Sequence, residues 1–226
     1  MKNKKKIAVL MAVVVVCTAV MGTFAPTGAG AAPRDVPARE IVAGTTIYFG
    51  KYQQGVIGKC GETAADAWAD GKTEGLDFVK SQNYSDGGDW YYYSKNPIAW
   101  TVLEKADGEL LLISRGYLAQ IQYGIVNDPI KWRTSYVRAL LNKNFFFDAF
   151  NAGERAAINT SQVETPENSV YGNPSTVDVT EDKVFLPSIE EVLQFMPADS
   201  DRNTADVTNY ILEPVFINID KKCFPW

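Results

Sequence analysis

The first 31 residues constrain the chain most, because they indicate a segment that is absent from the mature protein. An apolar run over residues 7–20 follows a basic cluster made of Lys2, Lys4, Lys5 and Lys6. Small residues then end at Ala31, and this order is typical of a secretory signal peptide cleaved after Ala31. The run is shorter than the roughly 20 residues of a membrane span, so a retained anchor is the less favoured alternative. We therefore expect a secreted or cell-surface protein with no stable membrane insertion after cleavage.

The amino-acid composition excludes several classes of partner and of catalytic chemistry. The chain has 22 basic and 27 acidic residues, and removal of the four N-terminal lysines leaves 18 against 27, a net charge of −9. This balance argues against nucleic acid as a partner, because such binding rewards clustered Lys and Arg. The chain has no histidine, which excludes His-based acid–base catalysis and His-ligated metal sites. No cofactor or metal site is expected.

Two cysteines, Cys60 and Cys223, remain after the predicted cleavage. An exported chain is in a disulfide-permissive environment, and two cysteines allow one intramolecular pair. A Cys60–Cys223 disulfide and two free thiols are both left open.

Local patterns predict several strands in a domain over residues 45–226, after a flexible leader over 32–44. Residues 45–52 alternate as in a strand. Residues 98–104 and 109–114 read as a hairpin, because an Asp-Gly step joins two apolar runs. A short strand is expected at 184–186, and residues 161–182 read as a long loop.

Helices are predicted mainly from their N-caps. Ser135 can cap a helix whose apolar positions include Val137 and Leu141. Asn151 with Glu154, and Ser188 with Glu191, look like capping boxes, and a further short helix is expected at Thr63–Ala69. The expected fold class is α+β, with short antiparallel strands, two or three short helices and long loops.

An ordered set of motifs over most of the mature chain resembles a large group of uncharacterised exported bacterial domains, known only as a domain of unknown function. The matching segments are Tyr48–Tyr52, Pro97–Leu103, Leu111–Ser114, the central set Trp132, Ser135, Arg138, Leu141, Asn142 and Phe145, the set Ala149, Phe150 and Glu154, and Asp182–Val192. The resemblance implies a fold distantly similar to C-type-lectin-like domains, which include formylglycine-generating enzymes. Cys60 and Cys223 match no motif of those enzymes, so no catalytic residue is carried over.

Family members continue beyond the position of Trp226, so the resemblance implies a domain that is incomplete at its C-terminus. Without those C-terminal segments we expect an unpaired strand edge near the Trp100 hairpin.

Two groups of residues are candidate ligand sites. The run Trp90, Tyr91, Tyr92 and Tyr93 is the first, because exposed aromatic clusters are typical of recognition surfaces. In a strand, alternate members face inward, so a core role for half of them is the alternative. Arg138 and Asn142 share a helix stripe with Ser135 and are the second candidate, although capping and internal pairing explain them better. A calcium-loop beginning at Asp199 departs from the required pattern at its sixth and twelfth positions.

The predicted function is a non-catalytic, secreted or cell-surface recognition or adhesion module that binds glycan or protein. The alternatives are an enzyme, either a carboxylate-based glycan hydrolase or a distant formylglycine-generating type, and a non-functional fragment. Absent histidines and unmatched cysteines weigh against the enzyme.

Overall fold

The computed structural model describes residues 8–10, 14–18, 41–83, 87–116, 118, 120–123, 131–165 and 178–198. Its strands are β1 (Ala8–Leu10), β2 (Val14–Thr18), β3 (Thr46–Lys59), β4 (Phe78–Asn83), β5 (Asp89–Ala106), β6 (Glu109–Ser114), β7 (Gln120–Gln122), β8 (Ser161–Thr165), β9 (Asp178–Asp182) and β10 (Val184–Phe185). Its helices are α1 (Thr63–Ala69), the 3-10 turn η3 (Trp132–Thr134), α2 (Tyr136–Leu140), the π-helical turn η4 (Leu141–Phe145), α3 (Phe146–Ala149), α4 (Ala152–Ala157) and α5 (Ile189–Phe195). The α+β class is confirmed.

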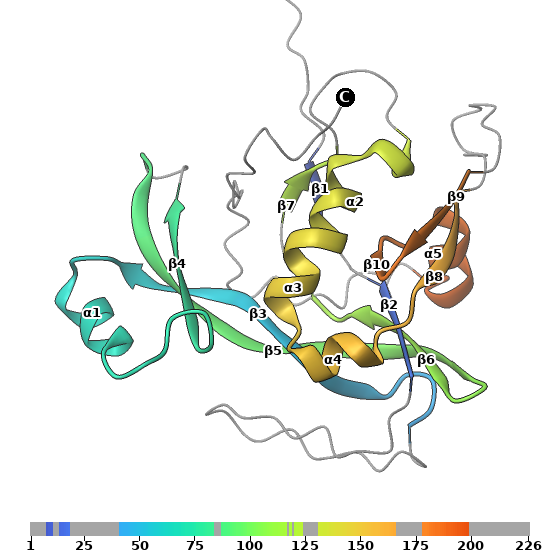
Figure 1. Ribbon diagram of the computed structural model, residues 1–226, viewed down its shortest axis with the longest axis horizontal. Coiled ribbons are helices and arrows are strands. Elements are labelled where there is room, and N and C mark those ends of the chain that lie inside the picture. Colours follow the sequence, from blue (N-terminus) through green and yellow to red (C-terminus); the bar gives the residue numbers. More distant parts are fainter. Residues whose placement is uncertain are drawn as a thin grey trace, which may run out of the picture.

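A six-stranded antiparallel sheet organises the domain around β5. The sheet runs in the order β10-β2-β6-β5-β3, and β4 pairs with β5 as well. The 18-residue β5 pairs with β3 along one edge. Its other edge pairs with β4 near the start of the strand and with β6 near the end. The sheet therefore has two parts, a central sheet over the core and a three-stranded extension at one end (Figure 1).

The predicted hairpin forms the middle of the central sheet. β5 and β6 meet at Asp107 and Gly108, which both have the positive φ that a two-residue hairpin turn requires. Ile98, Trp100 and Val102 alternate along β5 and are at most 1% exposed. This is the period-two burial expected of a strand with one face on the core.

A bulge in β3 connects this sheet to the helices. The pairing register shifts between Tyr48 and Lys51, and Gly50 adopts a φ of +69° there. The Phe49 carbonyl accepts a hydrogen bond of 2.7 Å from the Trp100 indole, and the Gly50 amide donates one of 3.0 Å to Glu154. A β-bulge turns backbone groups out of the ladder, so here it lets the sheet hold the α4 cap.

Three helices begin at the caps that the sequence predicted. Ser135 accepts a hydrogen bond from the Arg138 amide, and both capping boxes are present. Trp132, Leu141, Phe145 and Phe185 share one buried cluster with Trp100. Helices form at all four positions where the sequence predicted one. The expected number of two or three short helices was therefore too low.

Two local expectations were wrong. Residues 161–182 are not one loop, because β8 and β9 pair at its two ends; buried polar residues, among them Asp182, hid the strand pattern. The leader does not extend to residue 44, since Ile41 is 3% exposed and lies in the core. On α5, Ile189 and Leu193 are 39% and 54% exposed.

The apolar run near the N-terminus takes part in the sheet. β2 lies between β6 and β10, and β1 pairs with β7. No helix in the described ranges has the length and apolar character needed to cross a bilayer.

Candidate functional site

The candidate site lies on the three-stranded extension of the sheet, which we call the arm. The arm consists of residues 53–59 of β3, all of β4 and residues 89–96 of β5, with α1 packed beside it. It projects from one end of the central sheet, as Figure 1 shows. The sequence did not predict β4, because glycine and aspartate dominate the region around it. The arm therefore brings together residues that no local motif connects.

Close packing of α1 fixes the arm. A side chain at Gly58 would approach the Cβ of Ala65 to 2.9 Å, so the absence of one lets the helix lie directly on β3. The Tyr92 hydroxyl donates a hydrogen bond of 2.9 Å to Asp66. This bond, with a smaller contribution from desolvation, raises the pKa of Tyr92 to about 12. Tyr92 is therefore a neutral donor at physiological pH.

The four residues of the aromatic run differ in burial and in contacts. Tyr93 is 8% exposed and belongs to the core, whereas Trp90 is 48% exposed. Tyr91 is half-buried, and Tyr92 is held by Asp66 and by an edge contact with the Phe78 ring. The expectation that alternate members face inward holds for Tyr93. Trp90 is the member of the run that presents its ring to solvent.

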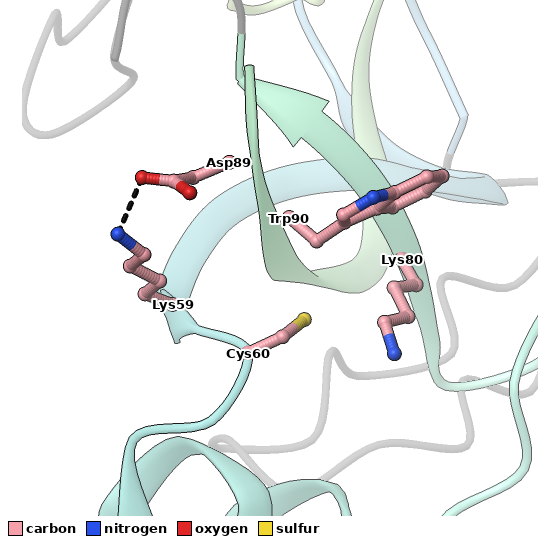
Figure 2. A pocket seen from close by; sticks show the side chains of 5 residues that line it. All are labelled: Lys59, Cys60, Lys80, Asp89 and Trp90. Carbon is pink, nitrogen blue, oxygen red and sulfur yellow. Dashed lines mark hydrogen bonds and ion pairs between the residues drawn. The ribbon is translucent and has the colours of Figure 1, made fainter. Parts of the chain in front are cut away.

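Trp90 contributes to a surface pocket of about 440 Å³. The lining residues are Lys59, Cys60, Lys80, Asp89 and Trp90. Figure 2 shows the Cys60 thiol between the Lys59–Asp89 pair on one side and Lys80 with the Trp90 ring on the other. Three strand segments supply this lining, and the Cys60 amide donates a 2.8 Å hydrogen bond to the Trp90 carbonyl. The pocket floor is thus part of the sheet.

Two cationic side chains and one anionic side chain give the pocket lining a net positive charge. Lys59 forms an ion pair with Asp89. The Lys80 ammonium lies 5.6 Å from the centroid of the Tyr92 ring, and no carboxylate pairs with it among the described residues. Cross-strand register explains this position, because Lys80 is opposite Tyr92 and therefore diagonal to Trp90. An aromatic ring beside an exposed ammonium is suited to a ligand with both an apolar face and an acidic group.

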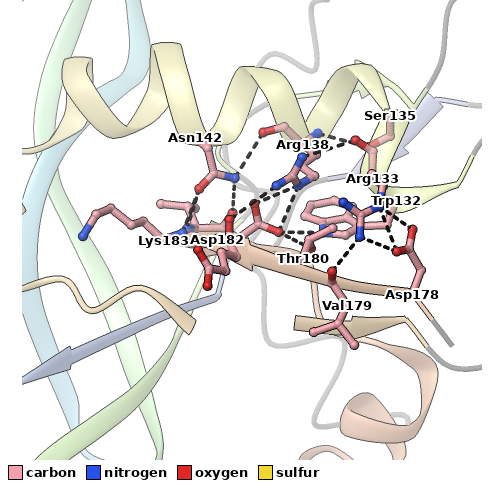
Figure 3. A network of polar contacts seen from close by, with 12 residues as sticks. Trp132, Arg133, Ser135, Arg138, Asn142, Asp178, Val179, Thr180, Asp182 and Lys183 are labelled. Atoms are coloured by element: carbon pink, nitrogen blue, oxygen red, sulfur yellow. Dashed lines mark hydrogen bonds and ion pairs between the residues drawn. The ribbon is translucent and has the colours of Figure 1, made fainter. Parts of the chain in front are cut away.

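Arg138 and Asn142 lie elsewhere, in a polar network between α2–η4 and β9–β10 (Figure 3). Arg138 forms an ion pair of 2.8 Å with Asp182, whose side chain is 1% exposed. Asp182 also accepts hydrogen bonds from the Trp132 indole at 2.9 Å and from Thr180 at 2.6 Å. The buried carboxylate therefore has three donors around it, as a buried charge requires.

Asn142 completes the same network. Its amide nitrogen donates to the Val184 carbonyl at 2.8 Å, and its amide oxygen accepts from the backbone of Lys183 at 2.8 Å and of Val184 at 3.2 Å. This pattern reproduces backbone pairing and holds β10 against the helix. The contacts of Arg138 and Asn142 fit the structural role that was their alternative, and we leave both out of the candidate site.

The remaining predicted features are the cysteine pair and the metal-binding patterns. Cys60 has no disulfide partner among the described residues and Cys223 lies outside them, so a Cys60–Cys223 disulfide and two free thiols both stay open. The calcium-like sequence at Asp199 also lies outside them. Within the described ranges, no three acidic or cysteine side chains gather in a metal-binding arrangement.

Sequence reasoning missed the charged members of the pocket. Lys59, Lys80 and Asp89 stand singly in the chain, and each is an ordinary surface residue by type. The signal in the sequence that could have located the pocket was the aromatic run, because a strand that contains it needs a neighbouring strand on each edge. Those neighbours, β3 and β4, supply the two lysines.

Comparison with known proteins gives one match. A family model described as a domain of unknown function, DUF6273, matches residues 107–213. The match includes the polar network around Asp182 and begins after the arm, so the Trp90 pocket lies outside it. No curated protein and no solved structure matches the chain. The uncharacterised-domain part of the resemblance is therefore supported, and the lectin-like part is not.

Proposed function

We propose that this protein is an exported, non-catalytic recognition module whose Trp90 pocket binds glycans that carry acidic groups. The observation that carries the proposal is the exposed Trp90 ring in a pocket beside Lys80. Trp is enriched among residues that dominate binding energy, because its ring offers a large contact area with few rotatable bonds.

The arrangement of charge favours an acidic ligand. The chain as a whole is negative, at −5, yet the pocket has Lys59 and Lys80 against Asp89 alone. A local positive patch on a negative surface attracts an anionic group and discourages nonspecific contact with other anions. A carboxylate, phosphate or sulfate on a sugar would approach Lys80 while the sugar ring lies on Trp90.

The rigidity of the pocket also supports binding. Trp90 lies on a strand that is paired on one edge by β4, and the adjacent Tyr91 is paired by both β3 and β4. The Tyr92–Asp66 hydrogen bond then ties that strand to α1. A preorganised site loses less conformational entropy when a ligand binds, so small contacts suffice for specificity.

The location follows from the N-terminal signature. The basic, apolar and small-residue order supports export, and a secreted or cell-surface module meets extracellular glycans there. A C-type-lectin-like fold is part of this proposal, and ligand binding at the Trp90 pocket does not require that fold.

The experiment is a screen of the purified chain beginning at Ala32 against arrays of neutral and acidic glycans, followed by calorimetric titration of the hits. Trp90→Ala should weaken binding at least about tenfold, which corresponds to about 1.4 kcal/mol. Phe147→Ala is the matched control, because Phe147 is 61% exposed on α3, outside the pocket. Lys80→Glu should also weaken binding, with Lys143→Glu as its charge-matched control.

Added salt should weaken binding by the parent chain more than by Lys80→Glu, because salt screens exposed charges. Equal losses in Trp90→Ala and Phe147→Ala would refute the pocket assignment. Binding restricted to protein ligands, with no glycan hit, would refute the glycan class.

A further inference from the structure

Side chains from both faces of the arm line the Trp90 pocket. Lys59 pairs opposite Tyr91, so its side chain shares a face with Asp89, two residues earlier on β5. Neighbours along a strand point to opposite faces, so Trp90 faces the other side, together with Lys80 of β4 (Figure 2). β3 ends at Lys59, and the pocket lies at this end of the strand. A ligand in the pocket therefore contacts two different surfaces.

The surface formed by Lys59 and Asp89 is suited to hydroxyl groups. The two side chains form an ion pair and are 40% and 46% exposed, so both are accessible to a ligand. A carboxylate only accepts hydrogen bonds and an ammonium only donates them, whereas a sugar hydroxyl does both. The two charges offset each other, so the pair offers no net attraction to an anion. We expect a neutral sugar to bind on this side of the pocket.

The surface formed by Lys80 and Trp90 is suited to an acidic sugar. Among the residues that the structure describes, no carboxylate pairs with the Lys80 ammonium, which lies 5.6 Å from the centroid of the Tyr92 ring. The whole lining has two ammonium groups and one carboxylate, so one ligand anion balances its charge. The volume of about 440 Å³ is in the range of pockets for drug-sized molecules, which leaves room for two sugar units.

We propose that Asp89 restricts the Trp90 pocket to glycans in which one acidic sugar adjoins a neutral sugar. This inference rests on the proposed binding of acidic glycans at Trp90 and names the class of glycan. Asp89 accepts hydrogen bonds from hydroxyls of the neutral sugar while the acidic sugar binds at Lys80 and Trp90. A second acidic group on the neutral sugar approaches the Asp89 carboxylate, and this like-charge contact disfavours densely charged polyanions.

Coulomb repulsion sets the size of the expected preference. Two like unit charges about 4 Å apart in water repel each other by an amount that corresponds to about fivefold in affinity. Partial exclusion of water from the pocket increases this effect. Lys59 reduces it, because its ammonium lies against the same carboxylate. Loss of the Lys59 charge should therefore strengthen the preference, whereas loss of the Asp89 charge should abolish it.

The test is calorimetric titration of the full chain with three tetrasaccharides. Unsulfated chondroitin alternates glucuronate with neutral N-acetylgalactosamine, chondroitin 4-sulfate adds a sulfate to the neutral sugar, and chitotetraose has no acidic group. The parent chain should bind unsulfated chondroitin at least about fivefold more tightly than chondroitin 4-sulfate. It should also bind unsulfated chondroitin more tightly than chitotetraose, because chitotetraose has no anion for Lys80.

Two variants should change the preference in opposite directions. Asp89→Asn should bind chondroitin 4-sulfate at least as tightly as unsulfated chondroitin, whereas Lys59→Gln should widen the preference of the parent chain. Asp70→Asn is the matched control, because Asp70 is exposed at the end of α1 and outside the pocket lining. It removes one negative charge beside the arm and should leave the preference unchanged.

Trp90→Ala, titrated in parallel, separates this inference from the proposed function. Equal affinity of the parent chain for the two chondroitins, or a preference that survives Asp89→Asn, would overturn the role of Asp89. Loss of both chondroitins in Trp90→Ala would in that case still support the pocket as a glycan site. No binding of unsulfated chondroitin by the parent chain would also overturn the inference, whereas other acidic glycans that bind the parent chain and not Trp90→Ala would leave the proposed function standing.

Discussion

Removal of the Asp182 carboxylate should be the most damaging single change in the polar network. Asp182 is 2% exposed and accepts from the Arg138 guanidinium at 2.8 Å and 3.0 Å, the Trp132 indole at 2.9 Å and the Thr180 hydroxyl at 2.6 Å. Asp182→Ala leaves one charged and two neutral donors without their acceptor. Breaking a buried ion pair by removing one partner costs about 3–5 kcal/mol.

That loss is a large fraction of the about 5–15 kcal/mol that stabilises an ordinary domain. For a domain of this size it corresponds to a fall of about 6–20 °C in Tm. Differential scanning calorimetry of the chain beginning at Ala32 is the assay. Urea unfolding of the same variants would give the free energy of unfolding independently.

The chain contains a matched control. Asp178, also on β9, pairs with Arg133 at 2.6 Å, but the Arg133 side chain is 52% exposed. Exposed pairs contribute little because water already solvates both charges. Asp178→Ala should therefore lower Tm far less than Asp182→Ala. Equal falls in the two variants would refute the reasoning that burial of the carboxylate decides the cost.

A double-mutant cycle would identify the partner. Arg138→Leu alone leaves the buried Asp182 charge unpaired, whereas Arg138→Leu with Asp182→Leu removes both charges. The double variant should be more stable than the sum of the single losses predicts, with a coupling of about 1–3 kcal/mol. Strict additivity would show that Arg138 does not compensate the Asp182 charge.

Four further outcomes are expected. Trp132→Ala should cost about 3–5 kcal/mol by urea unfolding, because the ring is 6% exposed in the core; an unchanged midpoint would contradict that burial. Gly50→Ala should cost at least about 1–3 kcal/mol, since φ is +69° and an added Cβ would lie 2.6 Å from a phenylalanine ring; full stability would show that the bulge can rearrange. In an absorbance titration, Tyr92 should ionise near pH 12, and Asp66→Ala should lower the pKa of Tyr92 toward 10. Because the pKa is raised in the folded state, the Tyr92–Asp66 hydrogen bond stabilises the fold below about pH 10, and this stabilisation is lost as the pH rises through 12. N-terminal sequencing of exported material should begin at Ala32, whereas an intact N-terminal lysine cluster on a membrane-bound form would contradict cleavage.

The sequence by itself determined the turns and helix caps, because each depends on residues only a few positions apart. The Asp107-Gly108 turn requires positive φ at consecutive residues, and a cap such as Ser135 satisfies backbone amides within the first helical turn, so each could be identified within a few residues. The apolar spacing of Val137 and Leu141 likewise predicted which face of the helix is buried.

Tertiary structure alone decided the features that depend on distant partners. The sequence did not predict β9, because Asp182 is a polar residue in a buried position. The buried Asp182 carboxylate is stabilised by Arg138, which lies 44 residues earlier in the chain. The pocket needed the pairing of β5 with β3 and β4 before Lys59, Lys80 and Trp90 could meet. A residue's type fixes its local propensities, but register between strands decides its neighbours, and register depends on the whole sheet.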